Sequence, residues 1–193
     1  ICSCKKDITS LNVDTKDARK VPAEALFANA QKNLSDLLAS SNVNTNIFRL
    51  IAQQWTQTTY TDESNYNLKT RQIPDRLFQT LYRDVLKNLQ EAKSIIANDA
   101  LKNGDVKANQ LAIADIMQVY AYHMLVNTFG NVPYTEALNY TNITPKYDDA
   151  KTIELDLLKR LKDDVATLNA NSTASSYDGS DLIYGGNVAK WIK

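Results

Sequence analysis

The 193-residue chain contains few of the residues on which common active sites depend. It has one histidine and two cysteines, and the cysteines, Cys2 and Cys4, stand one residue apart. A pair this close in sequence is poorly placed for a disulfide bond, and a zinc site would need further ligands. The sequence also lacks a His-Glu-x-x-His motif, a phosphate-binding glycine loop and a dinucleotide fingerprint. It therefore predicts no metal site, no cofactor and no catalytic residues.

Glycine and proline are also scarce, with 5 and 4 residues, and this scarcity favours long helices over a turn-rich β-sandwich. Lysine plus arginine and aspartate plus glutamate both number 22, so the formal net charge is zero. A balanced charge provides no basic surface for nucleic acid and no polybasic patch for lipid headgroups. No segment approaches the ~20 consecutive apolar residues that a membrane-spanning helix requires. We expect a helical protein that binds no nucleic acid.

The first four residues resemble the end of a lipoprotein signal peptide. Ile1-Cys2-Ser3-Cys4 combines an aliphatic residue, two small residues and a cysteine, the pattern that a lipoprotein signal peptidase recognises. We predict that Cys4 carries the lipid and that residues 1–20 are a signal remnant and polar tether. The remainder, residues 21–193, would then be held on the membrane only through this lipid anchor. The alternative is that the two cysteines are close to the start of the chain by chance.

Apolar residues recur at helical spacing in most of the remaining chain. A first helix is expected from Pro22 to about residue 40 because proline is favoured in the first helical turn. A second is expected from Thr45, with Ile47, Ile51 and Trp55 on one stripe. A third should begin at Pro74 and end at Asn103-Gly104, a typical helix stop. Further helices are expected over about residues 107–128 and 148–169, and another from residue 187.

The helix over 107–128 is apolar on almost every face, which predicts a central position with neighbours on several sides. Short polar turns between the helices predict antiparallel hairpins, and no segment reads convincingly as a strand. The expected fold class is all-α, with tetratricopeptide-like antiparallel helical hairpins and long ordered loops, although no strict 34-residue repeat occurs. Because Lys193 lies within an apolar-periodic stretch, we interpret residues 21–193 as the amino-terminal part of a longer helical domain.

The titratable residues favour structure over catalysis. His123 lies in the most apolar helix, so we expect it in the core or half-buried, with one hydrogen bond. The pair Asp148-Asp149 lies at a helix start, where the helix dipole favours anions, and Asp163-Asp164 is expected on a solvated face. Glycoside hydrolysis needs two acids that face each other across the sugar bond, one with a raised pKa. We therefore predict that the protein is not an enzyme.

Aromatic residues suggest where a ligand binds. Tyr60 and Tyr66 lie off any helical stripe in the polar segment after the second helix, near Asn65 and Arg71, and Trp55 lies at its edge. Planar rings stack on the C–H faces of sugars while amides and hydroxyls bind sugar edges. We predict a ligand-binding patch from these five residues. Two alternatives stay open: Trp55 completes the core stripe of the second helix, or both tyrosines fold back over the helix ends.

Three strings then resemble one known family. Residues 122–138 contain Phe-Gly-Asn-Val-Pro-Tyr-Thr-Glu-Ala-Leu, residues 145–148 read Pro-Lys-Tyr-Asp, and residues 181–191 read Asp-Leu-Ile-Tyr-Gly-Gly-Asn-Val-Ala-Lys-Trp. In this order they resemble motifs of the SusD/RagB family, most closely its SusD-like, starch-binding-associated branch. Asn131 and Asn187 stand where the family more often has aspartate.

The resemblance implies a helical, SusD-type surface lipoprotein of the bacterial outer membrane. Such a protein would act as the lid or partner of a SusC-type TonB-dependent transporter and capture an oligosaccharide or other nutrient without catalysis. It does not identify the ligand, because ligand-binding residues in the family lie in variable loops. The matching glycines and proline are expected to be structural: Gly130 and Pro133 in a turn, Gly185 and Gly186 before a helix. The alternatives are a helical-repeat protein–protein adaptor, and an enzyme whose catalytic residues lie beyond residue 193.

Overall fold

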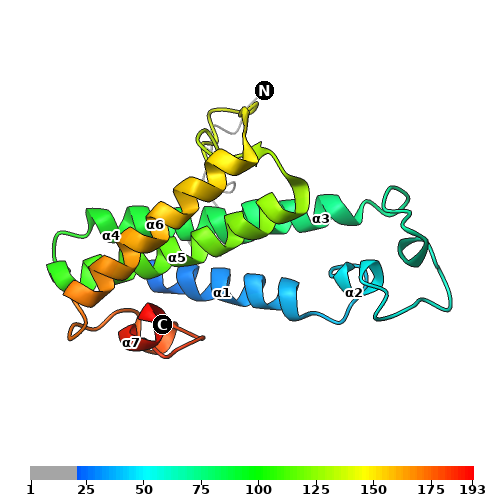
Figure 1. Ribbon diagram of the computed structural model, residues 1–193. Coiled ribbons are helices and arrows are strands. Elements are labelled where there is room, and N and C mark those ends of the chain that lie inside the picture. The colour runs from blue at the N-terminus through cyan, green and yellow to red at the C-terminus, as the bar shows by residue number, and fades with distance from the viewer. Residues whose placement is uncertain (1–20) are drawn as a thin grey trace, which may run out of the picture.

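Long antiparallel helices dominate the computed structural model, which describes residues 21–193 (Figure 1). Three of the long elements are α1 (Ala23–Ala39), α5 (Gly104–Phe129) and α6 (Ala150–Ala170). A fourth is continuous and consists of α3 (Ile73–Gln79), the π-helix η3 (Thr80–Leu86) and α4 (Lys87–Asn98). The short elements are α2 (Phe48–Ile51), the 3-10 helices η2 (Glu63–Asn65) and η4 (Asp178–Ser180), α7 (Val188–Ile192) and the two-residue strands β1 (Val132–Pro133) and β2 (Tyr147–Asp148). The all-α fold class is confirmed. The predicted tether and Cys4 lie outside the described residues.

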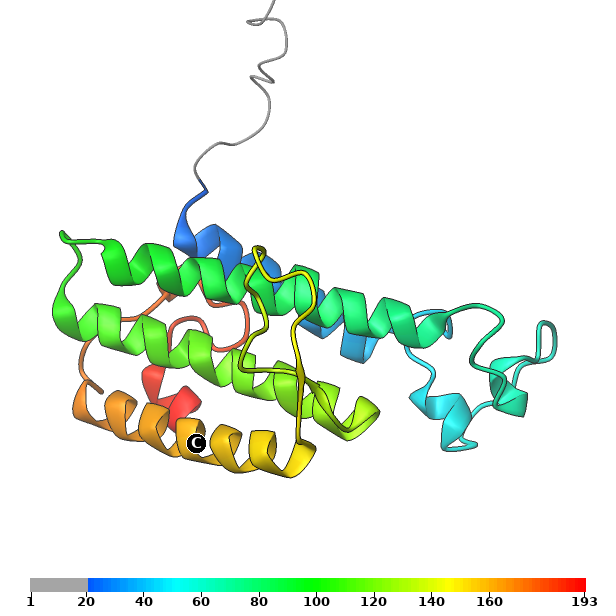
Figure 2. The ribbon, with the colours of Figure 1, turned by 90° about the horizontal axis from the view of Figure 1, so that it is seen from above.

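The helices pack as successive antiparallel neighbours. α1 lies along η3 and α4, α4 lies along α5, and α5 lies along α6, as Figures 1 and 2 show from two directions. This arrangement gives α5 helices on several sides, as its apolar sequence predicts. No helix among residues 21–193 is both long enough and apolar enough to span a bilayer.

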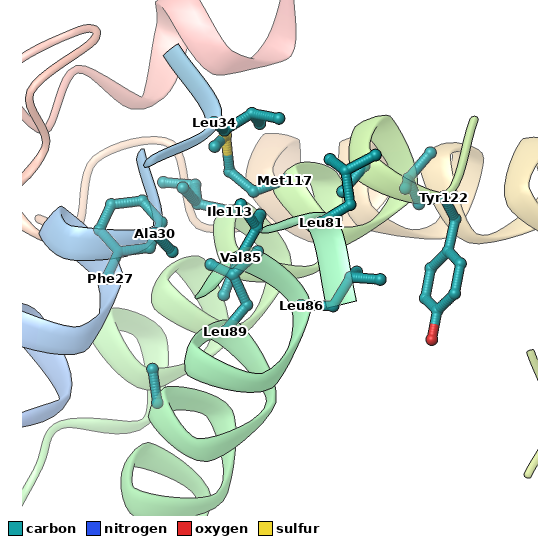
Figure 3. Close-up of a cluster of buried hydrophobic side chains, with 14 of the residues drawn as sticks. Phe27, Ala30, Leu34, Leu81, Val85, Leu86, Leu89, Ile113, Met117 and Tyr122 are labelled. Carbon is teal, nitrogen blue, oxygen red and sulfur yellow. The ribbon is translucent and has the colours of Figure 1, made fainter. Parts of the chain in front are cut away.

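The core fills the space between α1, η3, α4 and α5. Figure 3 shows its side chains, which include Phe27, Ala30, Leu34, Leu81, Val85, Leu86, Leu89, Ile113, Met117 and Tyr122. Most of them are fully buried, and burying one large apolar side chain contributes roughly 1.5–3 kcal/mol relative to leaving it exposed. The periodic apolar residues of the first, third and fourth expected helices thus form one continuous core.

The second expected helix is shorter than predicted. α2 ends at Ile51, and Gln53 follows with a left-handed backbone (φ 57°), which turns the chain away from the helix axis. Ile47 is buried, but the exposed fraction is 37% for Ile51 and 47% for Trp55. The stripe therefore does not continue to Trp55, and the interpretation of Trp55 as a core residue is wrong.

The third expected helix ends at Asn98, before the predicted stop at Asn103-Gly104. Asn103 instead caps α5, because its side-chain oxygen accepts hydrogen bonds from the backbone N–H of Asp105 (2.9 Å) and Val106 (3.3 Å). Asparagine is favoured both before a helix and after one, so the same dipeptide signals either boundary.

The turn residues have the expected structural roles. Gly130 ends α5 with a φ of 75°, and Gly185 and Gly186 precede α7 with φ of 62° and 76°. A Cβ atom on Gly186 would lie 2.7 Å from the backbone of Asp178, so only glycine fits there. Pro133 belongs to the short pair of β1 with β2, and its carbonyl accepts a hydrogen bond from the Tyr82 hydroxyl (2.5 Å).

The paired acids after β1 behave partly as predicted. Asp149 caps α6 by accepting a hydrogen bond from the backbone N–H of Thr152 (2.9 Å). Asp148 has a different partner, because it accepts hydrogen bonds from the backbone N–H groups of Tyr134 (3.1 Å) and Thr135 (2.7 Å). These bonds fasten the segment that follows β1 to the strand that precedes α6.

A buried carboxylate organises the last described segment. Asp181 is 3% exposed, and its two oxygens accept hydrogen bonds from the side chains of Gln31 (3.0 Å) and Trp191 (2.7 Å). The backbone N–H groups of residues 183, 184 and 186 also donate to it. Burial pushes the pKa of Asp181 upward, but the hydrogen bonds outweigh burial and hold this pKa below its ordinary value. Asp181 thus joins α7 and its preceding loop to α1.

A second network joins α4, α5 and α6. The Arg160 guanidinium donates two hydrogen bonds to Asp115 (2.7 and 2.9 Å), and Lys93 forms an ion pair with the same carboxylate. Asp164 lies beside Asp115, and its Oδ2 atom is buried without a hydrogen-bond partner among the described residues. Burial and the neighbouring Asp115 charge raise the pKa of Asp164 to about 8. The prediction of a solvated pair is therefore correct for Asp163, which is 63% exposed, and wrong for Asp164.

We expect Asp181→Asn to lower the free energy of unfolding by about 2–3 kcal/mol at pH 7, because the introduced amide NH₂ would face two donors. Because the pKa of Asp181 is lowered on folding, its stabilisation is present above the ordinary aspartate pKa near 3.9 and decreases below it. The difference between the two proteins should shrink in acid. Urea unfolding at pH 7 and pH 3.5 measures both values. The control is Asp178→Asn at an exposed neighbouring position, where asparagine tolerates the left-handed backbone. This variant should change the free energy of unfolding by less than about 0.5 kcal/mol.

We expect Asp164→Asn to raise the free energy of unfolding at pH 8 by about 2 kcal/mol. The raised pKa means that the folded protein binds a proton that the unfolded chain releases near pH 4, so wild-type stability falls as the pH rises from about 4 to about 8. The variant lacks this loss because its amide stays neutral, so its advantage should grow across that window. The exposed Asp163→Asn serves as the control. Equal stability of wild type and Asp164→Asn at pH 4 and pH 8 would contradict the buried protonated acid.

Candidate ligand-binding loop

Residues 52–72 connect α2 to α3 and contain all five predicted ligand-binding residues. Figure 1 shows this segment beyond the end of the helix bundle. Four of its non-glycine residues, Gln53, Tyr60, Tyr66 and Gln72, have positive φ between 50° and 60°. A left-handed residue of this kind is unfavourable by roughly 1 kcal/mol and persists only where surrounding contacts hold it. We refer to residues 52–72 as the projecting loop.

A fully buried acid, Glu63, holds the projecting loop together. Arg71 donates to both of its carboxylate oxygens, with Nε 2.7 Å from Oε1, and Gln57 Nε2 donates to Oε2 (2.9 Å). Gln57 also pairs with Ser64, so the two sides of the loop are cross-linked at a second point. The hydrogen bonds from Arg71 lower the pKa of Glu63 to about 2, so the carboxylate stays charged at neutral pH. Paired, bidentate geometry makes this a strong interaction.

Arg71 therefore has a structural role in addition to any contact with a ligand. Besides Glu63, its guanidinium donates to the side-chain oxygen of Asn44 (2.8 Å), and its side chain is 32% exposed. The prediction missed Glu63 because an acid eight residues before an arginine in a polar loop has no periodic signal. Asn65 is exposed, and its side-chain NH₂ donates to the Thr61 hydroxyl (3.2 Å).

The three aromatic side chains differ in how freely they face solvent. Tyr60 is 77% exposed, and Tyr66 is 52% exposed. The Tyr66 hydroxyl bonds to the carbonyl of Ile51 (3.3 Å) and accepts from Gln53 Nε2 (3.0 Å). Tyr66 thus folds back onto the end of α2 while it keeps half of its surface exposed, and Tyr60 does not. On Trp55, the Arg49 guanidinium lies 4.9 Å from the ring centroid.

The structure places all five residues on the projecting loop, but no hydrogen bond or ring contact joins any two of them. The loop offers exposed aromatic faces and amide groups around an internally neutralised Glu63–Arg71 pair. Such a surface suits a neutral ligand with apolar C–H faces and hydroxyl edges. Among residues 21–193, no group of three or more His, Cys, Asp or Glu side chains could hold a metal ion.

The single histidine lies outside this loop. His123 is at the surface, with its side chain 51% exposed, and its Nδ1 atom lies 3.0 Å from a Glu154 carboxylate oxygen. Of the two expected placements, the core is excluded. Leu158 and Tyr184 line the same surface hollow as His123 and Glu154. The histidine thus has an acidic partner and an apolar wall as its neighbours, rather than a nucleophilic side chain.

Comparison with known proteins identifies the chain's relatives. A SusD-like family model, described as "Starch-binding associating with outer membrane", matches residues 15–193. No curated protein matches the chain. Among solved structures, a chitin-binding protein is similar with 24% identity and a TM-score of 0.69 over 89% of this chain. A SusD/RagB family protein from Bacteroides thetaiotaomicron VPI-5482 is similar with 20% identity and a TM-score of 0.66 over 90% of it.

The chain spans 36% of the length of each of these two proteins. At these identities the solved structures establish the fold, and the family model covers nearly all of the sequence. The motifs that carry the resemblance have defined places in the structure: Gly130 caps the end of α5, Pro133 belongs to β1, and Asp181 accepts a hydrogen bond from Trp191. The chain belongs to the SusD-like family of starch-binding proteins associated with the outer membrane.

Proposed function

We propose that this protein captures a glycan at the bacterial cell surface without catalysis and acts as the lid or partner of a SusC-type TonB-dependent transporter. Membership of the SusD-like family supports an outer-membrane location and a carbohydrate ligand. The similarity to a chitin-binding protein supports β-linked N-acetylated sugars as a second ligand class beside starch.

The observation that carries the proposal is the pair of exposed tyrosines on a fixed loop. Tyr60 and Tyr66 keep 77% and 52% of their surfaces exposed while the buried Glu63–Arg71 pair holds the loop backbone. A preorganised ring loses little conformational freedom when a sugar stacks on it, so more of the stacking energy contributes to affinity. Asn65, between the two tyrosines in sequence, has a side-chain oxygen that can accept a hydrogen bond from a sugar hydroxyl.

We expect the double variant Tyr60→Ala, Tyr66→Ala to weaken oligosaccharide binding by about tenfold or more, because each stacked ring contributes roughly 0.5–1.5 kcal/mol. The measurement is titration calorimetry of the purified protein with maltoheptaose and with chitohexaose. Tyr66→Phe removes only the hydroxyl bonds to Ile51 and Gln53, so it separates support of the loop from stacking. Tyr120→Ala, on an exposed part of α5, is the matched control. Unchanged affinity with an unchanged melting temperature would remove the two rings from the site.

Attachment to the membrane is proposed through a lipid on Cys4. We expect Cys4→Ala to move the protein from the membrane fraction to the supernatant while its helical circular dichroism stays the same. Buried acyl chains contribute ~0.8 kcal/mol per CH₂, and the charged tether offers little apolar surface to replace them. Cys2→Ala is the matched control and should stay with the membrane. The comparison is made in cells without the transporter partner, and retention of Cys4→Ala in the membranes of those cells would refute the anchor.

A further inference from the structure

A second surface on this chain has the composition of a sugar site. A cavity of about 620 Å³ is lined by residues of α4 and α5, by Arg160 of α6 and by the segment after β1, residues 134–140. Figure 2 shows the connection between α5 and α6 crossing over α4 and α5. The volume of the cavity is within the range of small-molecule sites, roughly 300–1,000 Å³. None of the five residues predicted on the projecting loop lines it. We call it the α4–α5 cleft.

The charged groups on the floor of the cleft are bonded to one another. Asp115 accepts hydrogen bonds from Arg160 and pairs with Lys93, and Gln118 accepts from both of these cations (3.3 and 3.0 Å). The Tyr134 hydroxyl accepts a hydrogen bond from Arg160 Nη1 (2.8 Å). Each charged group of the floor therefore has a hydrogen-bonded or ionic partner within the protein.

The segment that covers the cleft is held in a strained conformation. Leu138 has a φ of 63°, which is unusual for a branched side chain, and Lys87 Nζ donates to its carbonyl (3.1 Å). Tyr140 follows with 84% of its surface exposed, and the Lys87 ammonium lies 5.2 Å from the centre of its ring. Lys87 thus contacts both the backbone of this segment and the Tyr140 ring, which lies at the edge of the cleft.

Polar groups in the wall remain available to a ligand. Among the described residues, no hydrogen bond uses the Glu91 carboxylate, the side-chain NH₂ of Gln90 or that of Asn139, although all three residues line the cleft. The oxygen of Gln90 accepts from Gln118 (3.3 Å), which orients its NH₂ away from that bond. Acceptors and donors thus surround one exposed ring. Lys87 and Glu91 carry opposite charges in the same wall.

We propose that the α4–α5 cleft is a second glycan-binding site, distinct from the projecting loop, that takes neutral pyranose units of an oligosaccharide. A pyranose ring stacks on Tyr140, and its hydroxyls donate to Glu91 and accept from Gln90 and Asn139. Hydroxyl-rich ligands fit because both donors and acceptors are free in the wall. The inference rests on the proposed function only for the choice of oligosaccharide.

The test compares four proteins by calorimetric titration with maltoheptaose and chitohexaose: wild type, Tyr140→Ala, the loop variant Tyr60→Ala with Tyr66→Ala, and the triple variant. We expect Tyr140→Ala to weaken binding at the cleft by about threefold to tenfold. The loop variant should retain a binding event at the cleft, and the triple variant should show that event weakened by the same factor. Glu91→Gln, which keeps the shape of the side chain, should also weaken that event. Tyr147→Ala, 65% exposed and outside the cleft lining, is the control.

The outcomes separate the two sites. Binding that the loop variant abolishes and Tyr140→Ala leaves unchanged would overturn the cleft while the proposed function stands. Binding that Tyr140→Ala and Glu91→Gln weaken and the loop variant leaves unchanged would support the cleft and remove the loop. If wild type binds either sugar and none of the variants weakens it, the cleft is overturned together with the loop. Because Tyr140 is 84% exposed, an unchanged melting temperature is expected and verifies that the fold is intact.

Discussion

Buried carboxylates need partners, and this constraint determines how the non-helical parts of the molecule are held. A charged acid that leaves water without compensating hydrogen bonds is strongly unfavourable, so the acids that stay charged in the interior accept hydrogen bonds from several donors. Glu63 gathers them within the projecting loop, Asp115 gathers them from α4 and α6, and Asp181 gathers them from α1 and α7. Both candidate binding surfaces lie on segments that such a network fixes.

The two networks closest to the surface differ in their consequences for binding. Glu63 and Arg71 form a bidentate pair at the centre of a loop that extends beyond the bundle, so they determine where Tyr60 and Tyr66 are presented. Asp115 lies between three helices, where it stabilises the floor of a cleft rather than a loop. The loop depends on one ion pair for its shape, whereas the cleft depends on helix packing, so the loop can vary in sequence with less effect on the fold.

Periodicity made the long helices predictable, because a stripe of apolar residues needs only local sequence to be recognised. The same signal failed at Trp55, since the stripe says nothing about whether a neighbour exists to cover its far end. It also failed to separate Asp164 from Asp163, because one residue along a helix turns a side chain by about 100° and can move it from solvent to the interior. Boundaries that depend on asparagine, such as Asn103, were ambiguous because that residue caps either end of a helix.

The residue types of the candidate site could be predicted from the sequence, but the contacts between its residues could not. Exposed aromatics in an aperiodic segment pointed to the projecting loop, and the structure places them there. The acid that organises the loop could not be inferred, because Glu63 acts through contacts with Arg71 and Gln57 rather than through spacing. The α4–α5 cleft was hidden for the same reason: Tyr140 and Glu91 are 49 positions apart in the sequence and meet only after α5 has reversed the chain direction.

The distribution of charge over the chain bears on the class of ligand that the two candidate surfaces can bind. The 22 basic and 22 acidic side chains balance overall, and the charged groups at the centre of the loop and on the floor of the cleft have opposite charges beside them: Glu63 lies beside Arg71, and Asp115 beside Arg160 and Lys93. A chain with no net charge exerts little long-range attraction on ionic ligands. Affinity must then come from contact, through ring stacking and hydrogen bonds to polar groups. Sugars offer both kinds of contact without a net charge, so the electrostatics of this chain and its exposed tyrosines favour the same class of ligand.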